Sequence, residues 1–213
     1  MIDLKVLANA EMKKTRDVIL AFPWEDKKAC AMWLAQTYYM VNHSTRLVAL
    51  AGGYSPLDQN ELHTRFVDHA KEERNHQLIC ISDLKAIGHR LDEFSCLHQA
   101  ACLAQIQYYW IQHRGPTSLF GYILSLECLA VEFGPELYRR TSAAFGKNAA
   151  NFLRVHSEDD VDHTEKAFQQ LNAFSDTEKV QIQENLEISA SLYRSMLDEI
   201  RCHVGERAIR KIA

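Results

Sequence analysis

Helix-breaking residues are scarce in this chain. Only 4 prolines and 8 glycines occur among 213 residues, and they fall between long stretches whose apolar residues recur with helical periodicity. No stretch alternates apolar and polar residues convincingly enough to predict a β-strand. The sequence therefore predicts an all-α protein, a bundle of about seven to eight helices that forms a single domain over residues 1–213.

Three other features are missing, and each absence excludes a class of protein. There is no run of roughly 18 uninterrupted apolar residues, and Met1–Lys5 lack the charged-then-apolar order of a signal peptide, so we expect no membrane span and a cytoplasmic location. The net charge is −4, and positive charge gathers only in the tail Arg207–Lys211, which disfavours a nucleic-acid partner. None of the 6 cysteines forms a C-x-x-C pair, which favours reduced, buried thiols over disulfides or a zinc site.

The prolines, glycines and capping residues predict where the helices begin and end. A capping box, Ser175-x-x-Glu178, opens the last of them, and a kink or a new helix is expected at Gly134-Pro135. The joints between helices are short, which favours one compact bundle. The expected helices cover approximately residues 3–21, 25–53, 58–88, 95–113, 117–134, a short stretch ending at 146, 149–174 and 175–205.

Histidine, in contrast, is abundant, with ten in 213 residues. Two segments, HAKEERNH and HSEDDVDH, share the spacing H-x3-[D/E]-x2-H. On a helix these offsets fall within roughly 60° of arc, so each trio is expected along one helical face. The trios are His69, Glu73 and His76 in the first segment, and His156, Asp160 and His163 in the second.

Imidazole and carboxylate are the ligands of non-haem iron or manganese, and helical bundles supply them to their core from facing helices. The two trios therefore predict a metal site. The alternative interpretation places them on solvated surfaces, because both segments are rich in charge and polar pairs four residues apart are ordinary there.

Glu127 lies within an apolar stretch, FGYILSLECLAVEFG. A carboxylate buried there needs a metal or another partner, since an isolated buried charge is very costly. One alternative is an ion pair with Arg139 or Arg140. Glu132 is the competing carboxylate, but five residues further on it points about 140° away.

These motifs together resemble the haem-oxygenase-like di-iron oxidase superfamily, whose fold is shared with thiaminase II and pyrroloquinoline-quinone synthase. The resemblance rests on HAKEERNHQLICISDLKAIG, GYILSLECLA and HSEDDVDH, covers roughly residues 35 to 175, and implies a haem-oxygenase-like bundle. It implies ligand roles for His76, His156, Asp160 and His163, with Glu127 as a bridging or terminal carboxylate and the candidate catalytic group.

The first motif departs from the pattern of that superfamily at one position. Some members have a glutamate seven residues before the histidine of the first helix, where this chain has His69. The missing carboxylate would then come from Glu73, or alternatively from Glu72. A histidine in place of a carboxylate lowers the negative charge of the site and can change its metal preference.

The resemblance implies a non-haem di-iron oxidase or oxygenase with two Fe(II) ions, or manganese, acting on O2 and a small organic substrate. Haem oxygenase itself has an axial histidine near its N-terminus, whereas no histidine precedes His43 in this chain. That activity is therefore disfavoured. Thiaminase-II-like hydrolysis would use Cys128 as its nucleophile, and cofactorless quinone synthesis would leave the paired trios unexplained. A non-catalytic binding protein is a further alternative, and long amphipathic helices also allow a homodimer.

Overall fold

The computed structural model describes residues 3–157, 168, 171 and 174–210. All the regular secondary structure in these residues is helical, which confirms the all-α prediction. Residues 151–157 form a further helical segment between η3 and α9. The named elements are α1 (Leu4–Leu20), α2 (Lys27–Val41), α3 (Ser44–Tyr54), α4 (Asn60–Glu72), α5 (His76–Ala86), η1 (Leu91–Glu93), α6 (His98–His113), η2 (Pro116–Ser118), α7 (Leu119–Phe145), η3 (Lys147–Ala149) and α9 (Asp176–Arg210).

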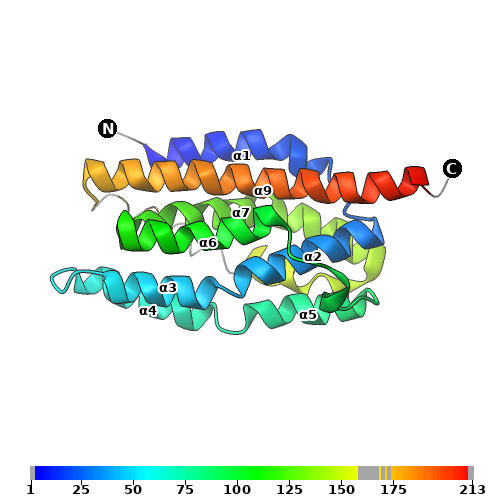
Figure 1. The fold of residues 1–213 in the computed structure, drawn as a ribbon, viewed down its shortest axis with the longest axis horizontal. Helices are drawn as coiled ribbons and strands as arrows, with labels where there is room; N and C mark the ends of the chain where they lie inside the picture. The colour runs from blue at the N-terminus through cyan, green and yellow to red at the C-terminus, as the bar shows by residue number, and fades with distance from the viewer. Residues whose placement is uncertain (1–2, 158–167, 169–170, 172–173, 211–213) are drawn as a thin grey trace.

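The helices run roughly along the long axis of the molecule and are stacked in layers across it (Figure 1). The longest helix, α9, packs against α7, α1 and α6. On the other side of the bundle, α3 packs against α4, and α2 packs against α5. The helix α7 therefore lies in the interior.

Helix α7 is the most apolar element of the bundle. An 18-residue window within Pro116–Phe145 reaches a mean hydropathy of 1.2, enough by length and composition for a membrane span, but 67% of that window is buried inside the protein. This burial is typical of a core helix. A Cβ atom at Gly121 would lie 2.3 Å from the carbonyl oxygen of Ile182, so glycine is what allows α7 and α9 to approach so closely.

Several helices begin at a capping side chain, although Asp58, expected to cap the helix after Pro56, does not: α4 begins at Asn60 with Gln59 at its N-cap and no side-chain cap. The Asp3 side chain accepts the backbone N–H groups that begin α1, and Asp26 does the same for α2. The capping box before α9 is also present: the Ser175 Oγ accepts the Glu178 N–H, and the Glu178 carboxylate accepts the Ser175 N–H.

Two helices that were expected to be continuous are interrupted in the structure. The helix expected over 25–53 is interrupted after Val41, and the one expected over 58–88 is interrupted at residues 73–75, where Asn75 has φ 74°. At Gly134-Pro135, where a kink or a new helix was expected, no new helix begins, because α7 continues through both residues. Phe133 and Leu137 are buried on either side of the proline, and this packing outweighs one missing backbone hydrogen bond.

Candidate metal centre

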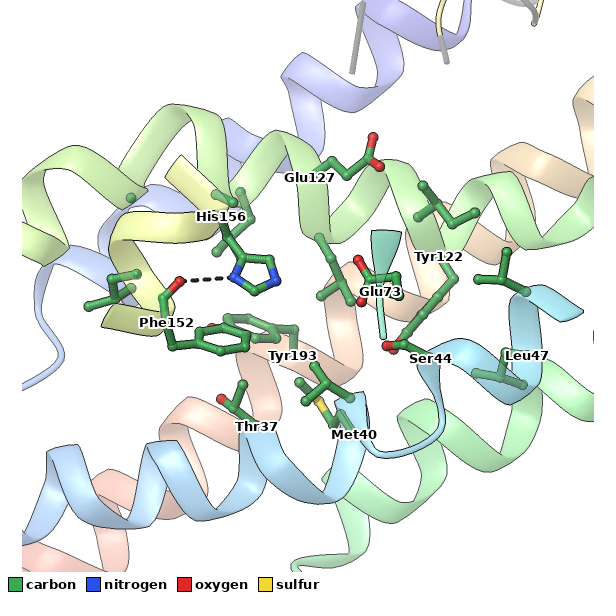
Figure 2. Close-up of a pocket in the computed structure, with 18 of the residues that line it drawn as sticks. Thr37, Met40, Ser44, Leu47, Glu73, Tyr122, Glu127, Phe152, His156 and Tyr193 are labelled. Carbon is green, nitrogen blue, oxygen red and sulfur yellow. Dashed lines mark hydrogen bonds between the residues drawn. The ribbon is translucent and has the colours of Figure 1, made fainter. Parts of the chain in front are cut away.

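His156 is held in one orientation by its own helical turn. Its Nδ1 lies 2.9 Å from the carbonyl oxygen of Phe152, and the Phe152 ring stacks on the imidazole at 4.0 Å between centroids (Figure 2). A carbonyl oxygen can only accept a hydrogen bond, so Nδ1 carries the proton. The lone pair is therefore on Nε2, the nitrogen that points away from Phe152 and towards the side of Glu73 in Figure 2.

Glu73 and His76 lie at the interruption between two helices. Helix α4 ends at Glu72, Glu73 follows it, and His76 is the first residue of α5. The expectation that the first trio lies along one continuous helical face is therefore wrong. The interruption nevertheless keeps the trio together, because the two Glu73 oxygens lie 3.7 Å from His69 Nε2 and 3.6 Å from His76 Nδ1.

Glu73, His76 and His156 form a cluster that can hold a metal ion. One ligand atom from each lies within 4.8 Å of the others, and the two imidazole rings are 4.9 Å apart in an edge-to-face arrangement. Bonds of about 2.1 Å place two ligands of one ion at most about 4.2 Å apart. The side chains would need to move closer together to share an ion.

Glu127 and His69 lie beside this cluster. Both are buried, with 6% and 5% of their surfaces exposed, and His69 Nε2 is 3.9 Å from Glu127 Oε1. His69 thus lies within 4 Å of both carboxylates, Glu73 and Glu127. The five side chains supply three imidazoles and two carboxylates to one region of the core.

The arginines that could have paired with Glu127 have other partners in the structure. Arg139 pairs with Glu136, and Arg140 pairs with Glu25, so neither arginine neutralises Glu127. Glu132 lies 3.6 Å from Arg16 of α1, outside the cluster. Glu127 is therefore the carboxylate of α7 that faces the candidate site.

The Glu73 carboxyl is held in its ionised form. Burial alone would raise its pKa, but interactions with His69 and His76 together lower the pKa well below the ordinary value of 4.5. A metal ligand must be a carboxylate rather than a carboxylic acid, so the environment of Glu73 suits this role.

An apolar cavity of about 100 Å³ adjoins the cluster, with His69, Glu73, Glu127 and His156 in its wall. Among the described residues that line it, none is lysine or arginine. Four uncharged polar side chains are exceptions to its apolar wall: Thr37, Ser44, Tyr122 and Tyr193.

Sequence reasoning missed these polar lining residues. Tyr122 lies within an apolar stretch of α7 whose sequence predicts only a core helix. Burial raises the pKa of its hydroxyl far above the ordinary value of 10, so the hydroxyl stays protonated. Cys128, the nucleophile of the thiaminase alternative, does not line the cavity. Asp160 and His163, the remaining members of the second motif, lie outside the described residues.

The donor set fits non-haem iron. Imidazole nitrogens and carboxylate oxygens are the ligands this metal takes, and manganese accepts the same donors. The carbonyl of Phe152 fixes the tautomer of His156, which is the usual supporting contact of a metal-binding histidine.

Comparison with known proteins agrees with this chemistry. Residues 31–194 match the model of a protein family described as an iron-containing redox enzyme, which is more than half of the chain. No curated protein matches the sequence significantly.

Solved structures show the fold. A domain of unknown function with a heme oxygenase-like fold from Shewanella denitrificans has a TM-score of 0.85 at 20% identity, covering 96% of this chain and 94% of its own. A TenA homologue from Pseudomonas syringae pv. tomato has a TM-score of 0.76 at 13% identity, with coverages of 92% and 91%. A TenA homologue from Pyrococcus furiosus has a TM-score of 0.63 at 14% identity, with coverages of 91% and 99%. The haem-oxygenase-like fold expected from the sequence is thus confirmed.

Proposed function

The chain belongs to the iron-containing redox enzyme family, and from that premise we propose that it is an O2-dependent non-haem di-iron oxidoreductase acting on a small organic substrate. One observation carries the proposal most strongly: ligand atoms of Glu73, His76 and His156 lie within 4.8 Å of one another beside an apolar cavity. A cluster of imidazoles and carboxylates on the protein surface would not be expected to adjoin an apolar cavity in which a substrate could bind.

The assignment of ligands follows the geometry where it is described and the sequence elsewhere. Glu73, His76 and His156 would hold one iron ion. Glu127 and His69 would contribute to a second, with Asp160 and His163 of the second motif as its remaining candidates. Bound ferrous iron would supply the electrons that reduce O2, and manganese is the alternative metal.

The chain itself supplies binding, orientation and exclusion of water. The apolar wall, with residues such as Met40, Leu47 and Ile123, favours a hydrophobic substrate, because burial of apolar surface is the main attraction it offers. Ser44 and Tyr122 can hydrogen-bond a polar group of that substrate (Figure 2). Because its hydroxyl stays protonated, Tyr122 can act as a hydrogen-bond donor through its Oη–H.

A metal-free hydrolase of the thiaminase type is the second candidate, since two of the structural neighbours are TenA homologues. Those neighbours share only 13% and 14% identity with this chain, so they bear on the fold alone. Cys128 is absent from the cavity wall, and a metal-free reaction would not need three imidazoles and two carboxylates gathered together. These two observations favour the redox proposal.

The test is metal content after anaerobic loading with Fe(II). We expect about two iron ions per chain, with loss of iron in His156→Ala and Glu127→Gln, and rapid consumption of O2 accompanied by a visible absorbance change. Glu132→Gln is the matched control, because Glu132 is on the same helix but pairs with Arg16. Wild-type protein that is folded and binds neither Fe(II) nor Mn(II) would contradict the proposal, and one iron per chain would contradict its di-iron part.

A further inference from the structure

A buried carboxylate lies outside the cavity wall and is not explained by the candidate metal centre. Asp83 of α5 is 0% exposed. Its Oδ1 accepts a hydrogen bond of 2.9 Å from Asn151 Nδ2, and its Oδ2 accepts one of 2.8 Å from the backbone N–H of Phe152. Burial raises the pKa of Asp83, and these hydrogen bonds oppose that rise. Because burying a carboxylate is energetically costly, we expect Asp83 to have a specific role in the structure or in the site.

The two partners of Asp83 begin the helical segment that carries His156. Phe152 in turn contacts His156 twice, through its carbonyl oxygen on Nδ1 and through its stacked ring. Asp83 therefore holds the N–H group of Phe152, the same residue whose carbonyl oxygen orients the imidazole. Displacement of Phe152 would move both contacts that orient His156.

The position of Asp83 along α5 gives this contact a further meaning. Helix α5 begins at His76, so His76 and Asp83 are separated by seven residues, or about 10 Å along one rigid element. One end of α5 supplies a cluster histidine, and the other docks the segment that supplies His156. The Asp83 contact thus links the two elements whose imidazoles lie 4.9 Å apart between ring centroids.

We propose that Asp83 is a positioning residue that fixes the His156 imidazole with Nδ1 protonated and Nε2 directed towards Glu73 and His76. The inference rests on the proposed function in treating His156 as a metal ligand. Asp83 is part of neither the cavity wall nor the cluster, so its effect is exerted through Phe152 and Asn151.

Two substitutions break the contact from opposite sides, and together they restore it. Asp83→Asn replaces one acceptor oxygen with a donor that faces either the Asn151 amide or the Phe152 N–H. Asn151→Asp places a second carboxylate against Asp83. In the double variant, the amide introduced at position 83 can donate to the carboxylate introduced at position 151, and the amide oxygen can still accept from the Phe152 N–H. Asp198→Asn is the matched control, since Asp198 is exposed and pairs with Arg201 of its own helix.

The experiment measures two quantities for these four variants and the wild type. The first is the dissociation constant of Fe(II) under anaerobic conditions. The second is the protonation of His156 Nδ1 in the metal-free protein, observed by NMR with 15N-labelled histidine. We expect each single variant of the contact to bind Fe(II) about tenfold more weakly and to lose the fixed Nδ1–H form of His156. The double variant should recover to within about threefold, and the Asp198 variant should match the wild type.

The outcomes separate this proposal from the one on function. If Asp83→Asn leaves both Fe(II) affinity and the His156 tautomer unchanged, the positioning role is overturned. If the wild type binds no metal, the proposed function fails, and the NMR comparison in metal-free protein still decides whether Asp83 orients His156. Should Asp83→Asn fail to fold, Asn151→Asp and the double variant give the same comparison, because Asn151 is only half-buried.

Discussion

The Glu73 carboxylate lies between the side chains of the two histidines of the first motif. One of its oxygens faces His69 and the other faces His76, although the two histidines belong to different helices. This arrangement keeps the carboxyl ionised in a buried position where burial by itself would favour the protonated acid. The charge of Glu73 is therefore part of what stabilises the metal-free protein.

Glu73 should make the stability of the metal-free protein sensitive to acid. Its pKa is lower in the folded protein than the ordinary value of 4.5, so its stabilisation is complete above that pH and is lost as the pH falls below it. We expect the free energy of unfolding of the wild type to fall on the order of 1 kcal/mol more than that of Glu73→Gln between about pH 5 and pH 3.

Chemical denaturation of metal-free protein across this pH range measures the difference. Glu61→Gln is the control, because Glu61 is an exposed carboxylate on α4, the helix that Glu73 follows. Equal pH profiles for the wild type and Glu73→Gln would contradict the electrostatic role assigned to Glu73.

At the scale of elements, the position of the segment 151–157 depends on close contact with α7. A Cβ atom added to Gly134 would lie 2.8 Å from the Cβ of Ser157, the residue after His156. Gly134 therefore lets the segment that carries His156 approach the helix that carries Glu127. The sequence marks Gly134 as a helix breaker, but the structure uses it for close packing.

Gly134→Ala should push the segment away from α7. We expect a loss of about 1–3 kcal/mol in the free energy of unfolding and weaker binding of Fe(II), because His156 moves with the segment. Ser157→Gly removes the opposing Cβ, so the double variant should regain both properties. Denaturant unfolding and metal titration of the two single variants and the double variant provide the measurement, and a fully additive result would count against steric contact between these residues.

The helix boundaries show what could be predicted from the sequence and what could not. Asp3, Asp26 and the Ser175 capping box are local signals, and the structure has helices beginning at each. No glycine or proline marks the interruption at residues 73–75, where only Asn75, a residue that tolerates positive φ, gives a cue. The continuity of α7 through Pro135 depends on packing between distant residues, which a local pattern does not contain.

The candidate site also contains some residues that could be predicted from the sequence and others that could not. The apolar residues around Glu127 predict its burial correctly, and the spacing of the histidine motifs identifies His76 and His156, which the fold brings together. Tyr122 and Ser44 could not be predicted as cavity residues, because their position depends on how α7 meets α3. The role of Asp83 could not be predicted from the sequence, because its hydrogen-bond partners lie 68 and 69 residues away along the chain.

At the scale of the whole molecule, the bundle is organised around the contact between α7 and α9. Gly121 lies at this contact, and an added Cβ there would come within 2.3 Å of the Ile182 carbonyl oxygen and 2.6 Å of the Leu186 nitrogen. Both are backbone atoms of α9, so no rotation of a side chain can relieve the clash. The two helices would have to separate.

Gly121→Ala should therefore destabilise the whole protein by about 3 kcal/mol or more, measured as a lower midpoint of thermal or denaturant unfolding. Gly53→Ala is the matched control, because Gly53 is also helical and an added Cβ there meets nothing within 4 Å. This control should be neutral or stabilising by up to about 1 kcal/mol, since alanine favours helix more than glycine does. Equal stabilities of the two variants would contradict the packing described at Gly121.

The interruption between α4 and α5 determines how the separation of Glu73 and His76 is set. In an unbroken helix, the distance between Glu73 and His76 would be dictated by the helical repeat. Here it is set by the torsion angles of a short link that includes the left-handed Asn75. A change in those torsion angles would therefore alter the separation of the two side chains, while α4 and α5 keep their internal hydrogen bonds.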